Sequence, residues 1–121
     1  ALRTLAERGV VDRTLRVDAT RGMETLAQVE SIGGLFDLVV SCASVPGTEM
    51  ASILSVKDGG TVIFFSMTTS FTAAALGAEG VGRDATLILG NGYVPGHAEL
   101  ALDLLRRDAG LRALFQERYG R

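Results

Sequence analysis

The amino-acid sequence predicts an α/β fold: a mostly parallel sheet flanked by helices. Segments with helical spacing of apolar residues alternate along the chain with short apolar segments of strand length. These strand-length segments are apolar almost throughout, which is typical of strands inside a parallel sheet. Most segments end at glycine, and the 121 residues contain 15 glycines but only 2 prolines. Strands separated by helices form parallel units with right-handed crossovers.

Each expected helix has a local signal. The first ends before Gly9, which suits the position after a helix C-terminus. Pro46 stands near the start of the third, where proline is common in the first turn. Apolar residues between Ala98 and Leu105 repeat at i, i+3, i+4 and i+7, as on one face of an amphipathic helix. The expected helices are residues 1–7, 21–32, 44–55, 73–78, 97–107 and 111–119.

The expected strands lie between these helices. Two of them, 36–42 and 61–66, are apolar almost throughout, so we expect them to be buried on both faces. A turn at 58–60 leads into the second of these. The complete set of expected strands is residues 15–18, 36–42, 61–66 and 86–89.

The order of elements is that of a Rossmann-like domain without its beginning. The chain opens in a helix with no strand before it. No glycine-rich turn follows a strand and opens a helix in the GxGxxG pattern that holds a pyrophosphate. The glycines Gly77, Gly80 and Gly82 precede a strand and have the spacing GxxGxG, so we expect them to form a turn. We therefore expect residues 1–121 to be a partial dinucleotide-binding domain that lacks the first strand and the glycine-rich turn.

Composition excludes several classes of function. A formal net charge of −2 and an isoelectric point near 5.3 argue against nucleic acid or an anionic membrane as partner. No apolar segment is long enough to span a bilayer, and no leader is visible, so we expect a cytoplasmic protein. The one cysteine, Cys42, excludes an internal disulfide, and no cluster of metal ligands is present.

The candidate binding site follows from the fold. In open parallel sheets, ligands bind beyond the carboxyl ends of the strands. The four expected strand ends are small or polar, which suits a flat ligand lying against the backbone. Polar ends are also expected wherever strands emerge into water, so both explanations remain open. The segments at these ends are residues 18–20, 41–44, 66–68 and 90–92.

Three single residues have two interpretations each. Asp18 could bind an adenine or a ribose, or it could cap the helix that follows. His97, the only histidine, could act as an acid or base near a helix N-terminus, although a surface position explains it more simply. Cys42 is expected to be a small core residue rather than a nucleophile.

Several longer motifs are much more specific than the fold class. They resemble L-erythro-3,5-diaminohexanoate dehydrogenase, a relative of the medium-chain dehydrogenases, over nearly the whole chain. The runs LGAEGVG and GNGY are the most distinctive. The segments that carry the resemblance are residues 36–42, 45–50, 56–62, 64–67, 74–82, 90–93 and 96–99.

The resemblance implies an NAD-dependent oxidative deamination in bacterial lysine fermentation. The substrate would be L-erythro-3,5-diaminohexanoate, and the products 5-amino-3-oxohexanoate, ammonia and NADH. This chain would be the NAD-binding portion, and its catalytic groups would lie elsewhere. The residues implied to contact NAD are Asp18 and Ala19 near the adenine, Ser41, Cys42 and Ala43 at the ribose and nicotinamide side, and Ser66, Met67, Asn91 and Gly92 at the nicotinamide end.

Two alternatives remain from the residues themselves. The strands would also suit a class I S-adenosylmethionine-dependent methyltransferase, but that fold needs a final antiparallel pair. The other alternative is a non-catalytic half-domain that pairs with a second copy through an edge strand at 86–89. Related dehydrogenases dimerise along this edge, so the resemblance also implies a homodimer.

Overall fold

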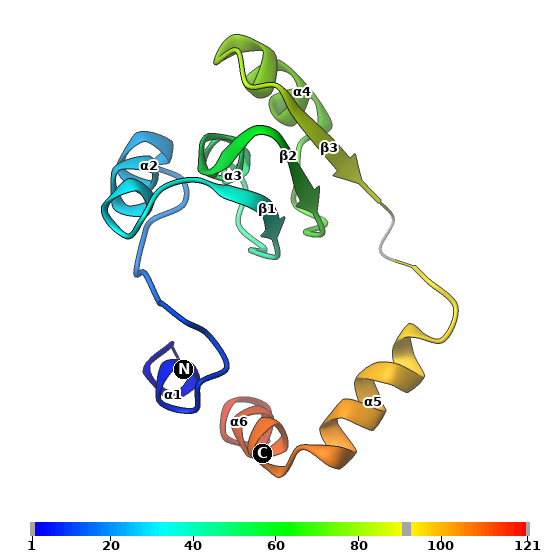
Figure 1. Cartoon of the computed structure of the whole chain (residues 1–121). Coiled ribbons are helices and arrows are strands. Elements are labelled where there is room, and N and C mark those ends of the chain that lie inside the picture. Colours follow the sequence, from blue (N-terminus) through cyan, green and yellow to red (C-terminus); the bar gives the residue numbers. More distant parts are fainter. Residues whose placement is uncertain (1, 91–92, 121) are drawn as a thin grey trace. The chain divides into compact units, whose positions relative to one another are not determined.

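A computed structural model gives the structure of residues 2–90 and 93–120, and the chain divides into two compact units (Figure 1). One unit is Leu15–Asn91; the other combines Ala1–Thr14 with Gly92–Arg121. The first unit contains all of the described sheet. Its parallel strands and packed helices confirm the predicted α/β, Rossmann-like class.

The sheet has three parallel strands in the order β1-β2-β3. Their bounds are Phe36–Ser41 for β1, Val56–Phe64 for β2 and Ala85–Leu89 for β3. Both β1 and β3 pair with β2 in parallel. One rung joins Val39, Val62 and Leu87, so these three side chains share a face of the sheet. Every pairing is therefore parallel in the described residues, without the antiparallel pair that a methyltransferase would need.

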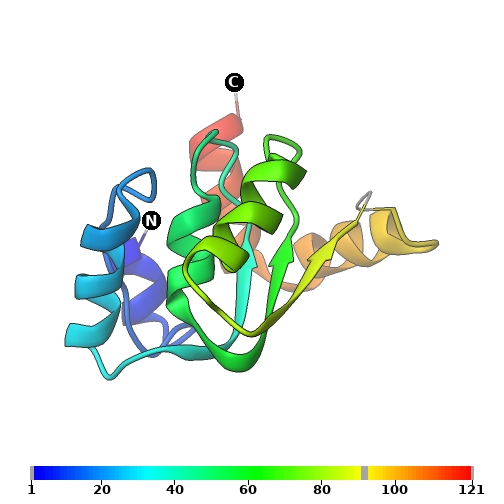
Figure 2. The ribbon, with the colours of Figure 1, turned by 90° about the horizontal axis from the view of Figure 1, so that it is seen from above.

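Three helices form a layer on one side of this sheet (Figure 2). They are α2 at Gly22–Ser31, α3 at Glu49–Ser55 and α4 at Phe71–Gly80. Helix α3 lies in the middle, where it packs against β1, β2 and both other helices, while α4 also contacts β3. The strands run toward the end of the unit at which these helices begin (Figure 2).

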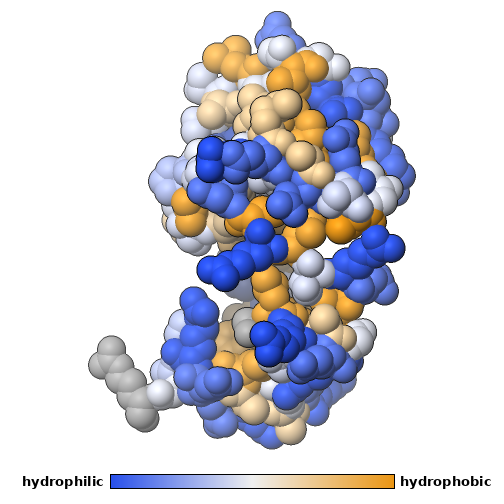
Figure 3. Space-filling model, turned by 90° about the vertical axis from the view of Figure 1, so that its left-hand side faces the viewer, coloured by the Kyte–Doolittle hydropathy of each residue, from blue (hydrophilic) through white to orange (hydrophobic). Residues whose placement is uncertain are grey.

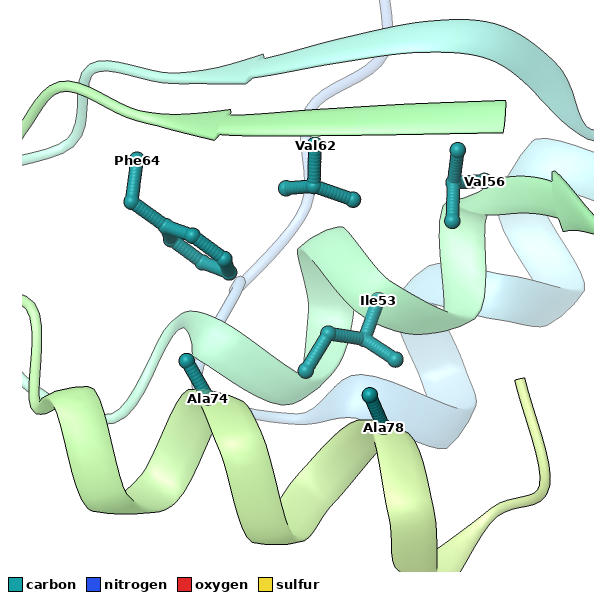
Figure 4. Close-up of a cluster of buried hydrophobic side chains, with 6 residues drawn as sticks. All are labelled: Ile53, Val56, Val62, Phe64, Ala74 and Ala78. Atoms are coloured by element: carbon teal, nitrogen blue, oxygen red, sulfur yellow. The ribbon is translucent and has the colours of Figure 1, made fainter. Parts of the chain in front are cut away.

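The core lies between the sheet and the helices α3 and α4 (Figure 4). Ile53 of α3 and Val62 of β2 are fully buried, and Ala74 and Ala78 of α4 face them. Gly77 lets α4 approach closely, since a Cβ there would lie 3.2 Å from Cδ1 of Ile53. Small residues on α4 thus leave room for the larger side chains of α3 and β2.

Within this unit, no described helix packs on the opposite face of the sheet. Leu38 and Val40 of β1 are 55% and 51% exposed, and Ile88 of β3 is 46% exposed. The expectation that residues 36–42 are buried on both faces is therefore wrong, because the described helices of this unit cover one face only. Hydrophobic residues also reach the surface among hydrophilic ones in the view of Figure 3.

The second unit is helical. It contains α1 at Leu2–Glu7, α5 at His97–Arg107 and α6 at Ala109–Tyr119. Asp108 caps α6, and its Oδ1 accepts a hydrogen bond from the amide of Leu111 at 2.8 Å. Among the described residues, no helix is both long and apolar enough to cross a membrane.

Some element boundaries differ from the prediction. Residues 15–18 are not a strand, since β1 pairs only with β2 and no strand in the described residues lies beside them. The helix expected from residue 44 begins at Glu49, because Gly47 has a φ of +83°, a left-handed conformation that interrupts a helix. Gly77 and Gly80 lie within α4 rather than in a turn, whereas Gly82 does form one with φ of +63°.

Candidate functional site

The ends of β1 and β2 are joined by one backbone group. The carbonyl oxygen of Ser41 accepts hydrogen bonds from the amides of Phe65 at 3.0 Å and Ser66 at 3.2 Å. These bonds continue the sheet past the last paired residues and fix the chain where it leaves β2. Two of the predicted strand-end segments, 41–44 and 66–68, thereby meet at Ser41 and Ser66.

A pocket of about 280 Å³ lies at the ends of β2 and β3. We call it the strand-end pocket. It contains two predicted site residues, Ser66 and Met67, and its walls are mostly apolar. The lining residues are Phe64, Phe65, Ser66, Met67, Thr69, Phe71, Leu89 and Gly90.

Sequence reasoning missed the three phenylalanines of this pocket. Phe64 is the last residue of β2, Phe65 follows it, and Phe71 opens α4, so each fits an ordinary structural role. In the structure, Phe64 is indeed a core residue at 3% exposed, whereas Phe65 is 59% and Phe71 68% exposed. An exposed aromatic side chain next to a pocket is a typical feature of a ligand site.

Hydrogen bonds between residues close in sequence fix the conformation of the loop after β2. The hydroxyl groups of Ser66 and Thr68 lie 2.8 Å apart, and Ser66 Oγ also accepts a hydrogen bond from the amide of Thr68 at 3.2 Å. The carbonyl oxygen of Ser66 accepts one from the amide of Thr69, also at 3.2 Å. Met67, at the tip, is fully exposed. The loop thus offers hydroxyl groups and one free apolar side chain to a ligand.

The segment after β1 is more exposed than predicted. Ser41 is buried, but Cys42 and Ala43 are exposed, and Cys42 is a free thiol. The interpretation of Cys42 as a core residue is wrong, because β1 ends at Ser41 and Cys42 lies in the loop beyond it.

Asp18 and Ala19 lie in a turn before α2. Asp18 Oδ1 accepts two hydrogen bonds from Thr20, one from the hydroxyl at 2.6 Å and one from the amide at 3.0 Å. The helix itself is preceded by Arg21 without a side-chain cap. Asp18 therefore does not cap α2. Its exposed carboxylate is oriented by Thr20, and the adenine or ribose interpretation stays a prediction.

The hydrogen bonds from Thr20, with a smaller contribution from the charge of Arg21, lower the pKa of Asp18 below its usual value of 3.8. The ionised carboxylate therefore stabilises the fold above the unfolded pKa, and this contribution is lost as the pH falls through the lowered pKa.

Thr20→Val removes the hydroxyl, so we expect the pKa of Asp18 to rise toward 3.8. An NMR titration of the carboxyl carbon measures the pKa of Asp18. Thr72→Val, on the exposed face of α4, is the control and should leave this pKa unchanged. An unchanged pKa of Asp18 in Thr20→Val would contradict the assignment.

The remaining candidates lie elsewhere. Asn91 and Gly92 are outside the described residues; Gly90, just before them, is part of the pocket wall. His97 belongs to the second unit, where its Nδ1 lies 2.7 Å from the carbonyl oxygen of Val94 and its ring meets Tyr93 edge-on. Because a carbonyl oxygen only accepts, Nδ1 is the donor in this hydrogen bond.

No protein-family model matches the chain, but curated proteins do. This chain is 47% identical over 117 residues to an L-erythro-3,5-diaminohexanoate dehydrogenase of Acetoanaerobium sticklandii. The match covers 95% of this chain and 34% of that protein. It is 49% identical over 104 residues to a protein of the same name from Fusobacterium nucleatum, covering 84% of this chain and 30% of that protein. The chain thus spans about a third of the length of these relatives. Its resemblance to part of such a dehydrogenase is confirmed.

Proposed function

We propose that this chain is the cofactor-binding segment of an L-erythro-3,5-diaminohexanoate dehydrogenase that uses NAD. The whole enzyme would oxidise the carbon bearing the 3-amino group, and water would replace the nitrogen, giving 5-amino-3-oxohexanoate and ammonia. This reaction would belong to the degradation of lysine by fermentation. The observation that carries the proposal is the strand-end pocket, which lies where a parallel sheet binds ligands, in a chain nearly half identical to part of two proteins of that name.

The pocket suits the nicotinamide end of NAD. Phe65 and Phe71 offer flat apolar surface to a ring, and Ser66 lies within the same wall. When bound, NAD supplies the acceptor for the hydride that leaves the substrate. Ser66 and Met67 would hold the nicotinamide side, and the exposed Asp18 would accept hydrogen bonds from the adenosine. The apolar walls would keep water away from the reacting carbon.

A segment exchange tests the proposal. In the Acetoanaerobium sticklandii relative, the matching segment is replaced by this chain, and NAD reduction with L-erythro-3,5-diaminohexanoate is followed by absorbance. We expect activity within about tenfold of the parent, or ~1.4 kcal/mol of transition-state stabilisation. Ser66→Phe, which fills the pocket, should raise the KM for NAD, while Thr72→Phe on the exposed side of α4 should not.

Two results would contradict it. If the exchanged enzyme folds and binds NADH but does not oxidise L-erythro-3,5-diaminohexanoate, this compound is excluded as the substrate. Equal KM values for NAD in the Ser66→Phe and Thr72→Phe enzymes would exclude the strand-end pocket as the cofactor site.

Self-association through β3 is a second proposal, and a specific observation favours it. Strand β3 pairs with β2 on one side only, so it is an edge of the described sheet. An edge strand can pair with its copy across a two-fold axis.

Thr86→Lys places like charges across such a pairing, and we expect it to convert a dimer into a monomer in sedimentation experiments. Thr72→Lys is the control. A monomeric parent chain at 100 μM, on the order of the concentration of a weak dimer, would contradict the proposal.

A further inference from the structure

Glu49 is a buried carboxylate that neither the motifs nor the proposed reaction explains. It is the first residue of α3 and only 5% exposed. Its Oε1 accepts a hydrogen bond from the amide of Ser70 at 2.7 Å, across 21 residues of sequence. Glutamate is rarely buried to this degree unless its charge has partners. A glutamate at the start of a helix gains from the helix dipole even when exposed, so the dipole does not account for the burial.

The partner of Glu49 occupies a key position. Ser70 is the N-cap of α4: its Oγ accepts a hydrogen bond from the amide of Ala73 at 3.2 Å, and its carbonyl oxygen accepts one from Ala74 at 3.0 Å. Glu49 therefore fixes the residue at which the loop after β2 turns into α4.

The loop is consequently held at both ends. This β2–α4 loop comprises residues 65–70. The carbonyl oxygen of Ser41 holds its first two amides, and the carboxylate of Glu49 holds its last. Four residues of this loop, Phe65, Ser66, Met67 and Thr69, line the strand-end pocket. Half of the pocket wall thus lies in a loop that a backbone carbonyl holds at one end and a buried side chain from another element holds at the other.

We infer that Glu49 is a positioning residue, whose carboxylate holds the β2–α4 loop in the conformation that binds the nicotinamide end of NAD. The role in cofactor binding rests on the proposed function; the role in ordering the loop does not. Without the acceptor, the loop samples other conformations, and a ligand must select one of them at a cost in affinity.

Two variants separate positioning from bulk structure. Glu49→Gln keeps an oxygen that can accept from Ser70, whereas Glu49→Ala removes it. We expect Glu49→Ala to weaken NADH binding by about tenfold, because the loop is no longer preorganised, and Glu49→Gln to restore it to within about twofold of the parent. Glu79→Ala, an exposed glutamate on α4, is the matched control. NADH titrations of the 121-residue chain followed by amide NMR give the affinities.

The same spectra contain a readout that does not need the ligand. In the parent chain, the amide proton of Ser70 should resonate downfield, as expected for a short bond to a carboxylate. It should move upfield in Glu49→Ala, with increased nanosecond motion in residues 65–70 and an unchanged core. If the isolated chain does not bind NADH, the affinities are measured in the exchanged Acetoanaerobium sticklandii enzyme. If that enzyme does not bind NADH either, the proposed function fails, and the relaxation measurement alone decides the positioning role. Unchanged motion of the loop in Glu49→Ala, or equal NADH affinity in Glu49→Ala and the parent, would overturn the inference.

Discussion

Ile53→Ala is expected to lower the free energy of unfolding by about 3–4 kcal/mol, within the range for buried isoleucine to alanine. Ile53 is fully buried between β2 and α4. Removing three carbons there leaves a cavity whose walls are the sheet and a helix, and neither can close it without breaking backbone hydrogen bonds. Because small domains have only about 5–15 kcal/mol of stability, the loss should be easily seen.

Urea unfolding followed by circular dichroism measures the effect of Ile53→Ala. Leu76→Ala is the matched control, since Leu76 lies on α4 but is 61% exposed. We expect it to change stability by roughly 0.5 kcal/mol or less. A similar loss of unfolding free energy in both variants would mean that the space between the sheet and the helices α3 and α4 is not the core of this unit.

Gly60→Val should be destabilising by about 3 kcal/mol, through close approach rather than a cavity. A Cβ at this position would lie 2.9 Å from the carbonyl oxygen of Asp37 and 3.0 Å from that of Lys57. Both are backbone atoms, so the side chain cannot be accommodated by a change of rotamer. The position lies beside the irregular register between Phe36 and Leu38, where β1 and β2 come together.

Gly80→Ala is the control for Gly60→Val. Gly80 is the last residue of α4, and a Cβ there would meet nothing within 4 Å. Alanine favours the helix over glycine by up to ~1 kcal/mol, so this variant should be neutral or slightly stabilising. The same urea transitions provide the comparison. If Gly60→Val unfolds at the same urea concentration as the parent, the result would contradict the close contact of Gly60 with the carbonyl groups of Asp37 and Lys57.

The fold was predictable where a local pattern decides it. Helix α5 has the predicted bounds, His97–Arg107, because the spacing of its apolar residues is set within the helix. Strand β3 differs from its prediction by one residue for a similar reason. Residues 15–18 have the composition of a strand, but a strand also requires a neighbour, and no sequence pattern shows whether one is present.

The proximity of the strand ends was predictable, but the contacts around them were not. Parallel strands bring their carboxyl ends together, and the amide of Ser66 does donate to the carbonyl oxygen of Ser41. The role of these two residues in cofactor binding stays a prediction. The role of Glu49 could not be predicted, because it depends on a hydrogen bond between residues 21 positions apart. Phe65 and Phe71 look like core residues in the sequence, because exposure is a property of the packed chain and not of the residue type.

The exposed Cys42 gives the chain a ready point of attachment for a reporter group. It is the only cysteine, and it stands one residue beyond the end of β1. A thiol-reactive fluorophore would therefore attach at a single place, without any engineered substitution. Because the carbonyl of the preceding residue, Ser41, holds the start of the β2–α4 loop, emission from that dye would report on rearrangements at the ends of both strands.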